Sequence, residues 1–379
     1  MTATPPSLTS ELEAHVLRVI RQARGWIGFD RFMELVLYAP GLGYYTRDNT
    51  QFGSMPWGAG AGSDFVTAPE MTPFFGRALA LQVRQALRVT QTREVWEFGA
   101  GTGAMARQLL EALGDQLERY TIVDLSGSLR ERQREVLAAY AAKLCWVNEL
   151  PVSFQGVVLG NEVLDAMPVK LLARTGGVWR ERGVAAGAGP VLAWEDRPSD
   201  LRPPLEIAGA HDYLSEIHAV TEAFVRTLAE RLDRGAAFFM DYGFPEREYY
   251  HPQRSMGTLM CHQAHRMDSN PLADLGHKDI TAHVNFTGIA LAAQQAAEPP
   301  GEGAKSAPFG VLGYTSQGRF MINCGLLPLL GNATLQERTM AQKLVMEHEM
   351  GELFKVIALF KGSPWDAIGF AQGDRTHTL

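Results

Sequence analysis

The chain has 379 residues, of which 46% are apolar and 20% are charged, and its formal net charge at pH 7 is −7. A chain of this length can bury one large core or two modest ones. The acidic balance argues against a general nucleic-acid binder, and no apolar stretch approaches the ~20 residues that cross a bilayer.

The N-terminal sequence, MTATPPSLTSELEAH, lacks both the apolar run of a signal peptide and the Arg-rich character of a transit peptide. We therefore expect a cytoplasmic protein without membrane insertion. The three cysteines, Cys145, Cys261 and Cys324, are odd in number and far apart, so reduced thiols are expected.

The N-terminal part is predicted to hold helices and one long loop. Apolar residues recur at helical spacing over 8–24, where Ser10 and Glu13 fit a capping box. A second helix is predicted over 30–39, because a Pro-Gly pair follows it. The stretch 41–70 is rich in glycine and aromatic residues and has neither a helical nor a strand period, so we predict a long ordered loop.

Strands and helices are predicted to alternate through the middle of the chain. Strands are predicted over 94–98, 119–125, 144–147, 156–160 and 236–243, and helices over 72–89, 104–113, 128–143 and 214–232. Residues 183–210 are predicted to be an irregular surface segment, 298–308 an exposed linker, 333–352 a helix and 354–360 a strand. The alternation predicts an α/β fold, with a mostly parallel sheet and helices on both faces.

The turn Gly99-Ala100-Gly101-Thr102-Gly103 lies between a predicted strand and a predicted helix, an arrangement that lets a ligand approach the backbone. A P-loop would need Lys-Ser/Thr where this chain continues with Ala104-Met105. A nicotinamide or flavin dinucleotide fits better, because Asp124 lies about 20 residues on, where a ribose-binding acid belongs.

S-adenosylmethionine is the third candidate ligand, and Glu97 favours it. An acid just ahead of the first glycine suits the ammonium and sulfonium groups of the methyl donor and would repel a pyrophosphate. These residues favour the methyl donor over a dinucleotide, and a purely structural glycine turn remains open.

Several motifs together extend this interpretation. They are GSDFVTAPE (62–70), EFGAGTG (97–103), IVDLSGSLRERQ (122–133), GNEVLDAMPV (160–169), MDYGF (240–244) and GHKDITAHVNF (276–286). In this order, from about Gly28 to about Gly362, the chain resembles the MidA family of methyltransferases. It departs from the family at Ala68, where a serine is usual, and at Asp124, where a glutamate is frequent.

The resemblance implies a class I, Rossmann-like methyltransferase fold with S-adenosyl-L-methionine as cofactor and an elaborated substrate-binding region. Its eukaryotic members include the mitochondrial arginine methyltransferase that assists assembly of respiratory complex I. The resemblance therefore implies a protein substrate methylated on arginine, with a respiratory-complex subunit as one class of partner. We expect helices and a donor-covering loop over 1–92, the core over 93–243, an inserted substrate-facing region over 244–303, and the completed core over 304–379.

The same resemblance assigns residues to the donor. Gly99, Gly101 and Gly103 would lie under its methionine and ribose, Glu97 would face its ammonium group or the water around that group, and Asp124 would accept both ribose hydroxyls. An ordinary acid at a strand end remains the alternative for Asp124.

Further donor contacts are expected from a second set of residues. Asn161 would lie beside the sulfonium, and Asp64, Thr67 and Glu70 would contact the donor from the covering segment. Ser126 is expected either to touch the donor or to cap the following helix.

The acceptor side is expected to be acidic. Glu162 is the first candidate for a carboxylate that orients a guanidinium and accepts a proton, and Asp165 is the second, with a turn-capping role as its alternative. Asp279 and His283 would close this side, and for His283 a structural role is preferred to that of a base. Orientation and exclusion of water would supply much of the acceleration.

Cys261, His262 and His265, with Asp268 and His277 nearby, are residue types that can bind a metal ion. The spacing matches no standard zinc pattern, so no metal is predicted. Two other functions compete with methyl transfer: a nicotinamide- or flavin-dependent oxidoreductase, and an assembly chaperone with a vestigial donor site. The sequence does not specify the oligomeric state.

Overall fold

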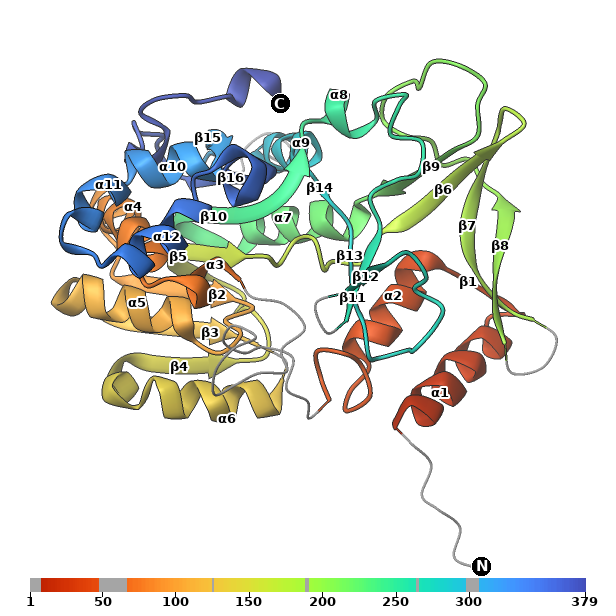
Figure 1. The fold of residues 1–379 in the computed structure, drawn as a ribbon, viewed down its shortest axis with the longest axis horizontal. Helices are drawn as coiled ribbons and strands as arrows, with labels where there is room; N and C mark the ends of the chain where they lie inside the picture. The colour runs from red at the N-terminus through yellow and green to blue at the C-terminus, as the bar shows by residue number, and fades with distance from the viewer. Residues whose placement is uncertain (1–7, 48–66, 125, 188–190, 264–265, 298–306) are drawn as a thin grey trace, which may run out of the picture.

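The structure is a computed structural model that describes residues 8–47, 67–124, 126–187, 191–263, 266–297 and 307–379. It has two lobes (Figure 1). One lobe is built on an eight-stranded sheet, and the other combines the first two helices with a five-stranded sheet.

The large sheet carries the strands expected from the alternating pattern. Its members are β2 (Glu94–Phe98), β3 (Arg119–Val123), β4 (Leu144–Val147), β5 (Phe154–Asn161), β10 (Leu232–Phe244), β14 (Val284–Asn285), β15 (Phe309–Ser316) and β16 (Phe354–Lys361). Seven run in the order β15-β16-β10-β5-β2-β3-β4, and β14 pairs with the end of β10. All neighbours are parallel except β16, which is antiparallel to both β10 and β15. Because the order reverses between β2 and β5, the carboxyl ends of these two strands form the crevice where such sheets bind ligands.

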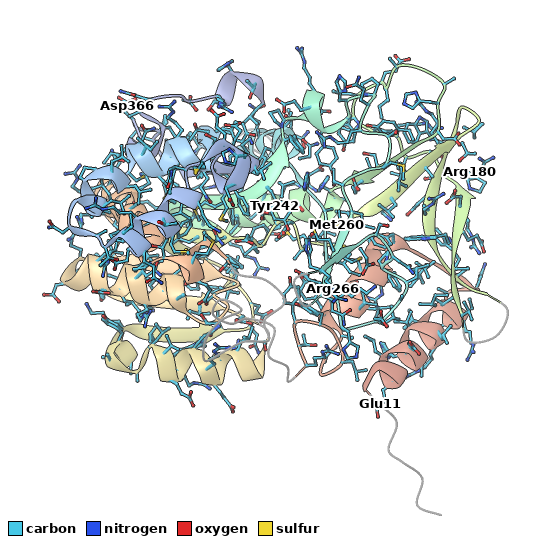
Figure 2. The ribbon with its side chains drawn as sticks, viewed as in Figure 1. Glu11, Arg180, Tyr242, Met260, Arg266 and Asp366 are labelled. Atoms are coloured by element: carbon cyan, nitrogen blue, oxygen red, sulfur yellow. The ribbon has the colours of Figure 1, made fainter. Side chains whose placement is uncertain are left out.

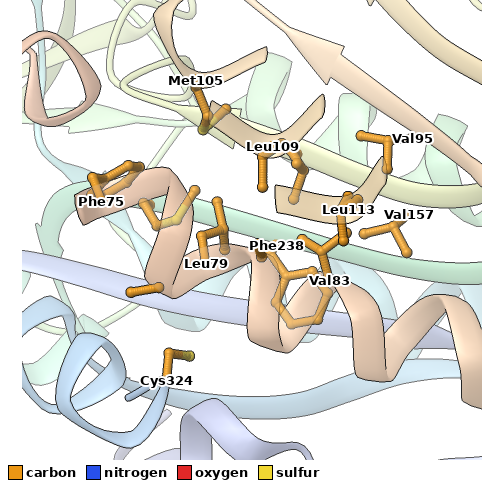
Figure 3. Close-up of a cluster of buried hydrophobic side chains, with 14 of the residues drawn as sticks. Phe75, Leu79, Val83, Val95, Met105, Leu109, Leu113, Val157, Phe238 and Cys324 are labelled. Carbon is orange, nitrogen blue, oxygen red and sulfur yellow. The ribbon is translucent and has the colours of Figure 1, made fainter. Parts of the chain in front are cut away.

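Helices cover both faces of this sheet, which confirms the predicted α/β architecture. The helices α4 (Phe74–Thr90) and α5 (Ala104–Leu113) pack on one face, and α7 (Ala219–Arg231) and α9 (Phe286–Ala297) pack on the other. Figure 3 shows Phe75, Leu79 and Val83 of α4 with Leu109 and Leu113 of α5, packed near Val95, Val157 and Phe238 of the strands. Two further helices are α3 (Ala68–Met71), which precedes α4, and α6 (Gly127–Val136), which follows β3. Burial of both faces explains why these strands are nearly continuous apolar runs.

The second lobe is an antiparallel structure. Its sheet contains β1 (Trp26–Gly28), β6 (Lys170–Thr175), β7 (Val178–Ala186), β8 (Leu192–Pro198) and β9 (Tyr213–Ile217). The helices α1 (Leu8–Gln22) and α2 (Phe29–Tyr38) pack on it through a separate apolar cluster. The range 93–243 was expected to form the core. Its strands between residues 170 and 217 instead pair in this separate sheet and not in the large one.

Three sequence predictions are wrong in this lobe. The segment 183–210 is irregular only in its second half, because β7 and β8 pair as an antiparallel hairpin that extends to Pro198, and no helix or strand follows up to residue 210. The first residues of the helix predicted over 214–232 belong to β9, and α7 begins only at Ala219. Ser10 cannot be the N-cap of α1, because the helix already includes Leu8.

The rest of the chain supplies small elements around the two sheets. A three-stranded sheet holds β11 (Met260–Gln263), β12 (Arg266–Asp268) and β13 (Asp279–Thr281) and packs on the apolar cluster of the second lobe. The remaining helices are α8 (Glu246–Tyr249), α10 (Gln317–Asn323), α11 (Leu326–Leu329) and α12 (Leu335–Lys343). The helix predicted over 333–352 is divided into α12 and a π-helical turn, Glu347–Gly351. Most of the linker predicted over 298–308 lies outside the described residues.

Candidate active site

A cavity of about 650 Å³ opens at the carboxyl ends of β2 and β5. Eleven of the predicted site residues line it: Thr67, Glu70, Glu97, Gly99, Gly101, Asp124, Ser126, Asn161, Glu162, Asp165 and Asp279. Figure 2 labels one further lining residue, Tyr242, between the two lobes. Asp64 lies outside the described residues, and Gly103 and His283 are not part of the lining.

The glycine turn bends sharply after β2. Gly99, Gly101 and Gly103 have φ values of +61°, +52° and +87°, a region that favours glycine. A Cβ on Gly99 would lie 3.0 Å from Val163 Cγ2, so the turn also packs closely on the loop after β5. A Cβ on Gly103 would instead meet the Leu137 side chain at 3.3 Å. Gly103 therefore permits close packing and does not line the cavity, contrary to the role expected for it.

Glu97 is a buried acid at the floor of the cavity, with 1% of its surface exposed. The Tyr120 hydroxyl donates a hydrogen bond of 2.5 Å to Glu97 Oε2. Burial raises the pKa of Glu97 to about 8, against the lowering effect of the Tyr120 hydrogen bond and with a further raising effect from Asp124. The carboxyl group is therefore largely protonated at neutral pH, and a bound cation would favour its charged form.

Asp124 is held in place at the end of β3. The Ser126 N–H donates to Asp124 Oδ1 at 2.9 Å, and Gln133 Nε2 donates to Oδ2 at 2.9 Å. Ser126 is also the N-cap of α6, with its Oγ accepting from the Leu129 N–H at 3.3 Å. The capping role expected for Ser126 is thus confirmed, and the Asp124 carboxylate is held by donors from α6 and its N-cap residue.

Glu162 follows β5 in a left-handed conformation, with φ +54°, which is uncommon for a residue other than glycine. Asn161 Nδ2 donates to Glu162 Oε1 at 3.0 Å, and the Ala68 N–H also hydrogen-bonds this carboxylate. Burial raises the pKa of Glu162 to about 8, and the nearby charges of Asp165 and Asp279 raise it further. The predicted acceptor carboxylates are therefore brought together.

Asp241, near the end of β10, fixes the loop that carries Glu162. Its Oδ2 accepts the N–H groups of Val163, Leu164 and Asp165 at 3.1, 2.9 and 3.3 Å. Burial and the charges of Asp165 and Glu162 raise its pKa well above the ordinary value. The sequence pointed to Asp241 only as an acid in a buried strand, and nothing local assigned it this role.

Two buried acceptor atoms in the cavity wall have no hydrogen-bond partner among the described residues: Asn161 Oδ1 and Asp165 Oδ1. Asn161 is 8% exposed and Asp165 is 4% exposed. Burial raises the pKa of Asp165 to about 6, while a hydrogen bond from Tyr242 opposes the shift. Buried polar atoms in folded proteins are almost always paired, so both atoms can accept hydrogen bonds from a ligand in the cavity.

Two tyrosines that sequence analysis missed, Tyr38 and Tyr45, extend this wall from the second lobe. The Tyr38 hydroxyl donates to the Ala166 carbonyl at 2.9 Å, and the Tyr45 hydroxyl donates to Asp279 Oδ1 at 2.7 Å. Another unpredicted residue, Thr102 of the glycine turn, donates its hydroxyl to Glu70.

His283 lies behind the site. Its ring contacts those of Tyr242 and Phe244 at centroid distances of 5.3 and 5.2 Å, and burial lowers its pKa to about 4. Its carbonyl accepts a hydrogen bond from His218 Nε2 at 2.8 Å when that nitrogen carries the proton. The placement supports the structural role and not that of a base in contact with a substrate.

Within the described ranges, no group of three or more His, Cys, Asp or Glu side chains is arranged to hold a metal ion. His265, one of the candidate metal ligands in the sequence, lies outside those ranges. None of the helices in the described part of the chain is long and apolar enough to cross a membrane.

The sheet order and the cavity at its switch point define a class I, Rossmann-like methyltransferase fold. The family model of S-adenosyl-L-methionine-dependent methyltransferases matches residues 78–302, and the chain belongs to this family. S-adenosylmethionine is therefore its cofactor.

Known proteins agree with this assignment. One similar protein, from Burkholderia thailandensis, has a crystal structure with S-adenosyl-homocysteine bound. Its sequence is 45% identical to this chain, and the two structures match with a TM-score of 0.90 over 100% of both chains. The mitochondrial protein arginine methyltransferase NDUFAF7 homologue of Drosophila melanogaster is 27% identical over 94% of this chain and 85% of its own length. The Caenorhabditis elegans homologue is 24% identical over 94% and 87%. These similarities confirm the resemblance to MidA-like methyltransferases.

Proposed function

We propose that the protein transfers a methyl group from S-adenosylmethionine to an arginine side chain of a protein. The observation that carries this proposal is the acidic cavity, in which Glu162, Asp165 and Asp279 face one space and Asp165 Oδ1 lacks a donor. A guanidinium, which is always protonated and carries five N–H donors in a plane, satisfies such a wall.

The residues beside the glycine turn fit the donor. Glu97 would pair with its ammonium group, Asp124 would accept its ribose hydroxyls, and the unpaired Asn161 Oδ1 would lie towards its charged end. Gly99 and Gly101 keep the cavity free of side chains at the turn. When bound, the donor supplies an electrophilic methyl group on a sulfonium.

On the acceptor side, Glu162 would hold one edge of the guanidinium and take the proton that leaves as the new N–C bond forms. The sulfur–methyl bond would break in the same step, with S-adenosyl-homocysteine as the leaving group. The Glu162 pKa of about 8 suits a base that works near neutral pH. Asp165 and Asp279 would hold the remaining N–H groups, so the reacting nitrogen is fixed in direction. Asp241 positions this loop without touching either ligand.

The names of the curated relatives support arginine as the acceptor, at 24–27% identity. A respiratory-complex subunit as client rests on the family resemblance alone. Those relatives are named mitochondrial, and we keep the cytoplasm as the proposed location for this chain, to be checked by fractionation of cells that express it.

The test is incubation of the full chain with methyl-labelled S-adenosylmethionine and a protein extract from cells that lack this chain. The labelled proteins are then hydrolysed in acid and their amino acids are separated. We expect label in methylarginine, and its loss in Glu162→Gln. The control is Glu195→Gln, the same change at an exposed residue of β8, and this variant should still transfer the label to methylarginine. Label in another amino acid would contradict the arginine assignment, and donor binding without transfer would favour the assembly chaperone.

A further inference from the structure

Part of the cavity wall is aromatic and rigid. Tyr38 and Tyr45 line the cavity, and their rings stack at a centroid distance of 5.5 Å with an interplanar angle of 21°. Tyr44, which is fully buried, packs edge-on against Tyr45 at 5.0 Å and 82°. The pair is therefore held from behind by the second lobe.

The hydroxyl group of each tyrosine is fixed by a hydrogen bond close to one of the two acids, Asp165 and Asp279. Tyr38 bonds to the Ala166 carbonyl, next in sequence to Asp165, and Tyr45 bonds to Asp279, which lies on β13. Burial and the charge of Asp279 raise the pKa of both tyrosines, so both stay neutral. Neutral rings next to carboxylates present an electron-rich surface to a cation.

We propose that Tyr38 and Tyr45 form, with Asp165 and Asp279, a subsite that selects a guanidinium over an ammonium group. This inference rests on the proposed function and deepens it, because it explains how arginine would be distinguished from lysine. A guanidinium is planar and weakly hydrated, so it can lie against an aromatic ring while its edge donates to Asp165 Oδ1. An ammonium is compact and strongly hydrated, and it loses more hydration in the same space.

The experiment compares two probes, Nα-acetyl-arginine amide and Nα-acetyl-lysine amide. Each is titrated by ligand-observed NMR into the full chain saturated with S-adenosyl-homocysteine. We expect the wild-type protein to bind the arginine amide at least about tenfold more tightly. Tyr38→Leu and Tyr45→Leu should weaken arginine binding about two- to thirtyfold, the range of a cation–π contact, and bring the two affinities together.

Matched variants separate the ring from the hydroxyl. Tyr45→Phe and Tyr38→Phe keep the ring and should keep the preference for the arginine amide. Calorimetric binding of S-adenosyl-homocysteine and the thermal unfolding curve check that each variant is folded.

An unchanged preference in both Leu variants would overturn this subsite and leave the methyl-transfer proposal in place. Equal binding of both amides by the wild-type protein would overturn it too, as would binding of neither amide. The labelled-donor assay, read in methylarginine, tests the proposed function independently of these probes.

Discussion

Replacing Glu97 by glutamine tests whether a buried neutral acid lies beneath the donor site. The pKa of Glu97 is raised from its ordinary value of 4.5 to about 8, chiefly by burial. An acid whose pKa is higher in the folded protein than in the unfolded chain stabilises the folded state while it is protonated. This contribution is complete at pH values below the unfolded-state pKa, and it is lost as pH rises to the folded-state pKa. Glutamine resembles the protonated acid at every pH, so the variant should not show this loss.

The size of the effect follows from the shift. One pKa unit corresponds to ~1.4 kcal/mol, so the wild-type protein loses about 4 kcal/mol relative to the variant between pH 5 and pH 8. With an unfolding entropy of ~2 cal/mol/K per residue, this corresponds to about 5 °C in melting temperature for a chain of this length. The buried amide adds a cost of its own, but that cost does not change with pH.

The assay is thermal unfolding of both proteins between pH 5 and pH 8 without ligands. Tm of Glu97→Gln minus Tm of the wild-type protein should rise by about 5 °C over this range. Glu352→Gln is the control: despite partial burial, hydrogen bonds from Arg375 lower the pKa of Glu352, so its difference should stay flat. A flat difference for Glu97→Gln as well would show that Glu97 ionises at its ordinary pKa, and the reasoning would fail.

Three further outcomes are expected. Gly101→Val should weaken binding of S-adenosylmethionine at least about tenfold by calorimetry, because Gly101 has φ +52° and lines the cavity. Asp241→Ala leaves three N–H groups without their acceptor and should lower the free energy of unfolding in urea by about 2–4 kcal/mol. His283→Gln should change the labelled-donor transfer rate less than Glu162→Gln does, because His283 does not line the cavity.

The parts of the fold that local signals determine were predictable. The strand at 94–98 and the helix at 104–113 are confirmed to the residue, because an apolar run, a glycine turn and a helical period mark them. The hairpin of β7 and β8 was missed because its strands carry charged residues and its sheet exposes one face. A capping-box pattern occurs at Ser10 and again at Thr334; Thr334 forms the box, whereas the backbone of Ser10 lies inside α1, which already includes Leu8.

The site was predictable where its residues belong to sequence motifs and hidden where they depend on long-range contacts. The loop with Asn161 and Glu162 was found from its place after a buried strand. Tyr45 meets Asp279 across 234 residues of sequence, and Asp241 holds a loop about 77 residues away, so no window of sequence could pair them. These contacts depend on how the second lobe and the carboxyl end of β10 lie against the loop after β5.

The electrostatics of the cavity would suit the proposed reaction, in which both partners are positively charged. Two cations repel each other at short range unless each is matched by a negative group. Glu97 lies on the glycine-turn side of the cavity and Glu162 in the loop after β5, and burial raises both pKa values to about 8. Each acid can therefore stay neutral in the absence of a ligand and become charged when its own cation binds. The chain would thus avoid the cost of two unpaired buried charges, and the proposed reaction would have one carboxylate for each cation.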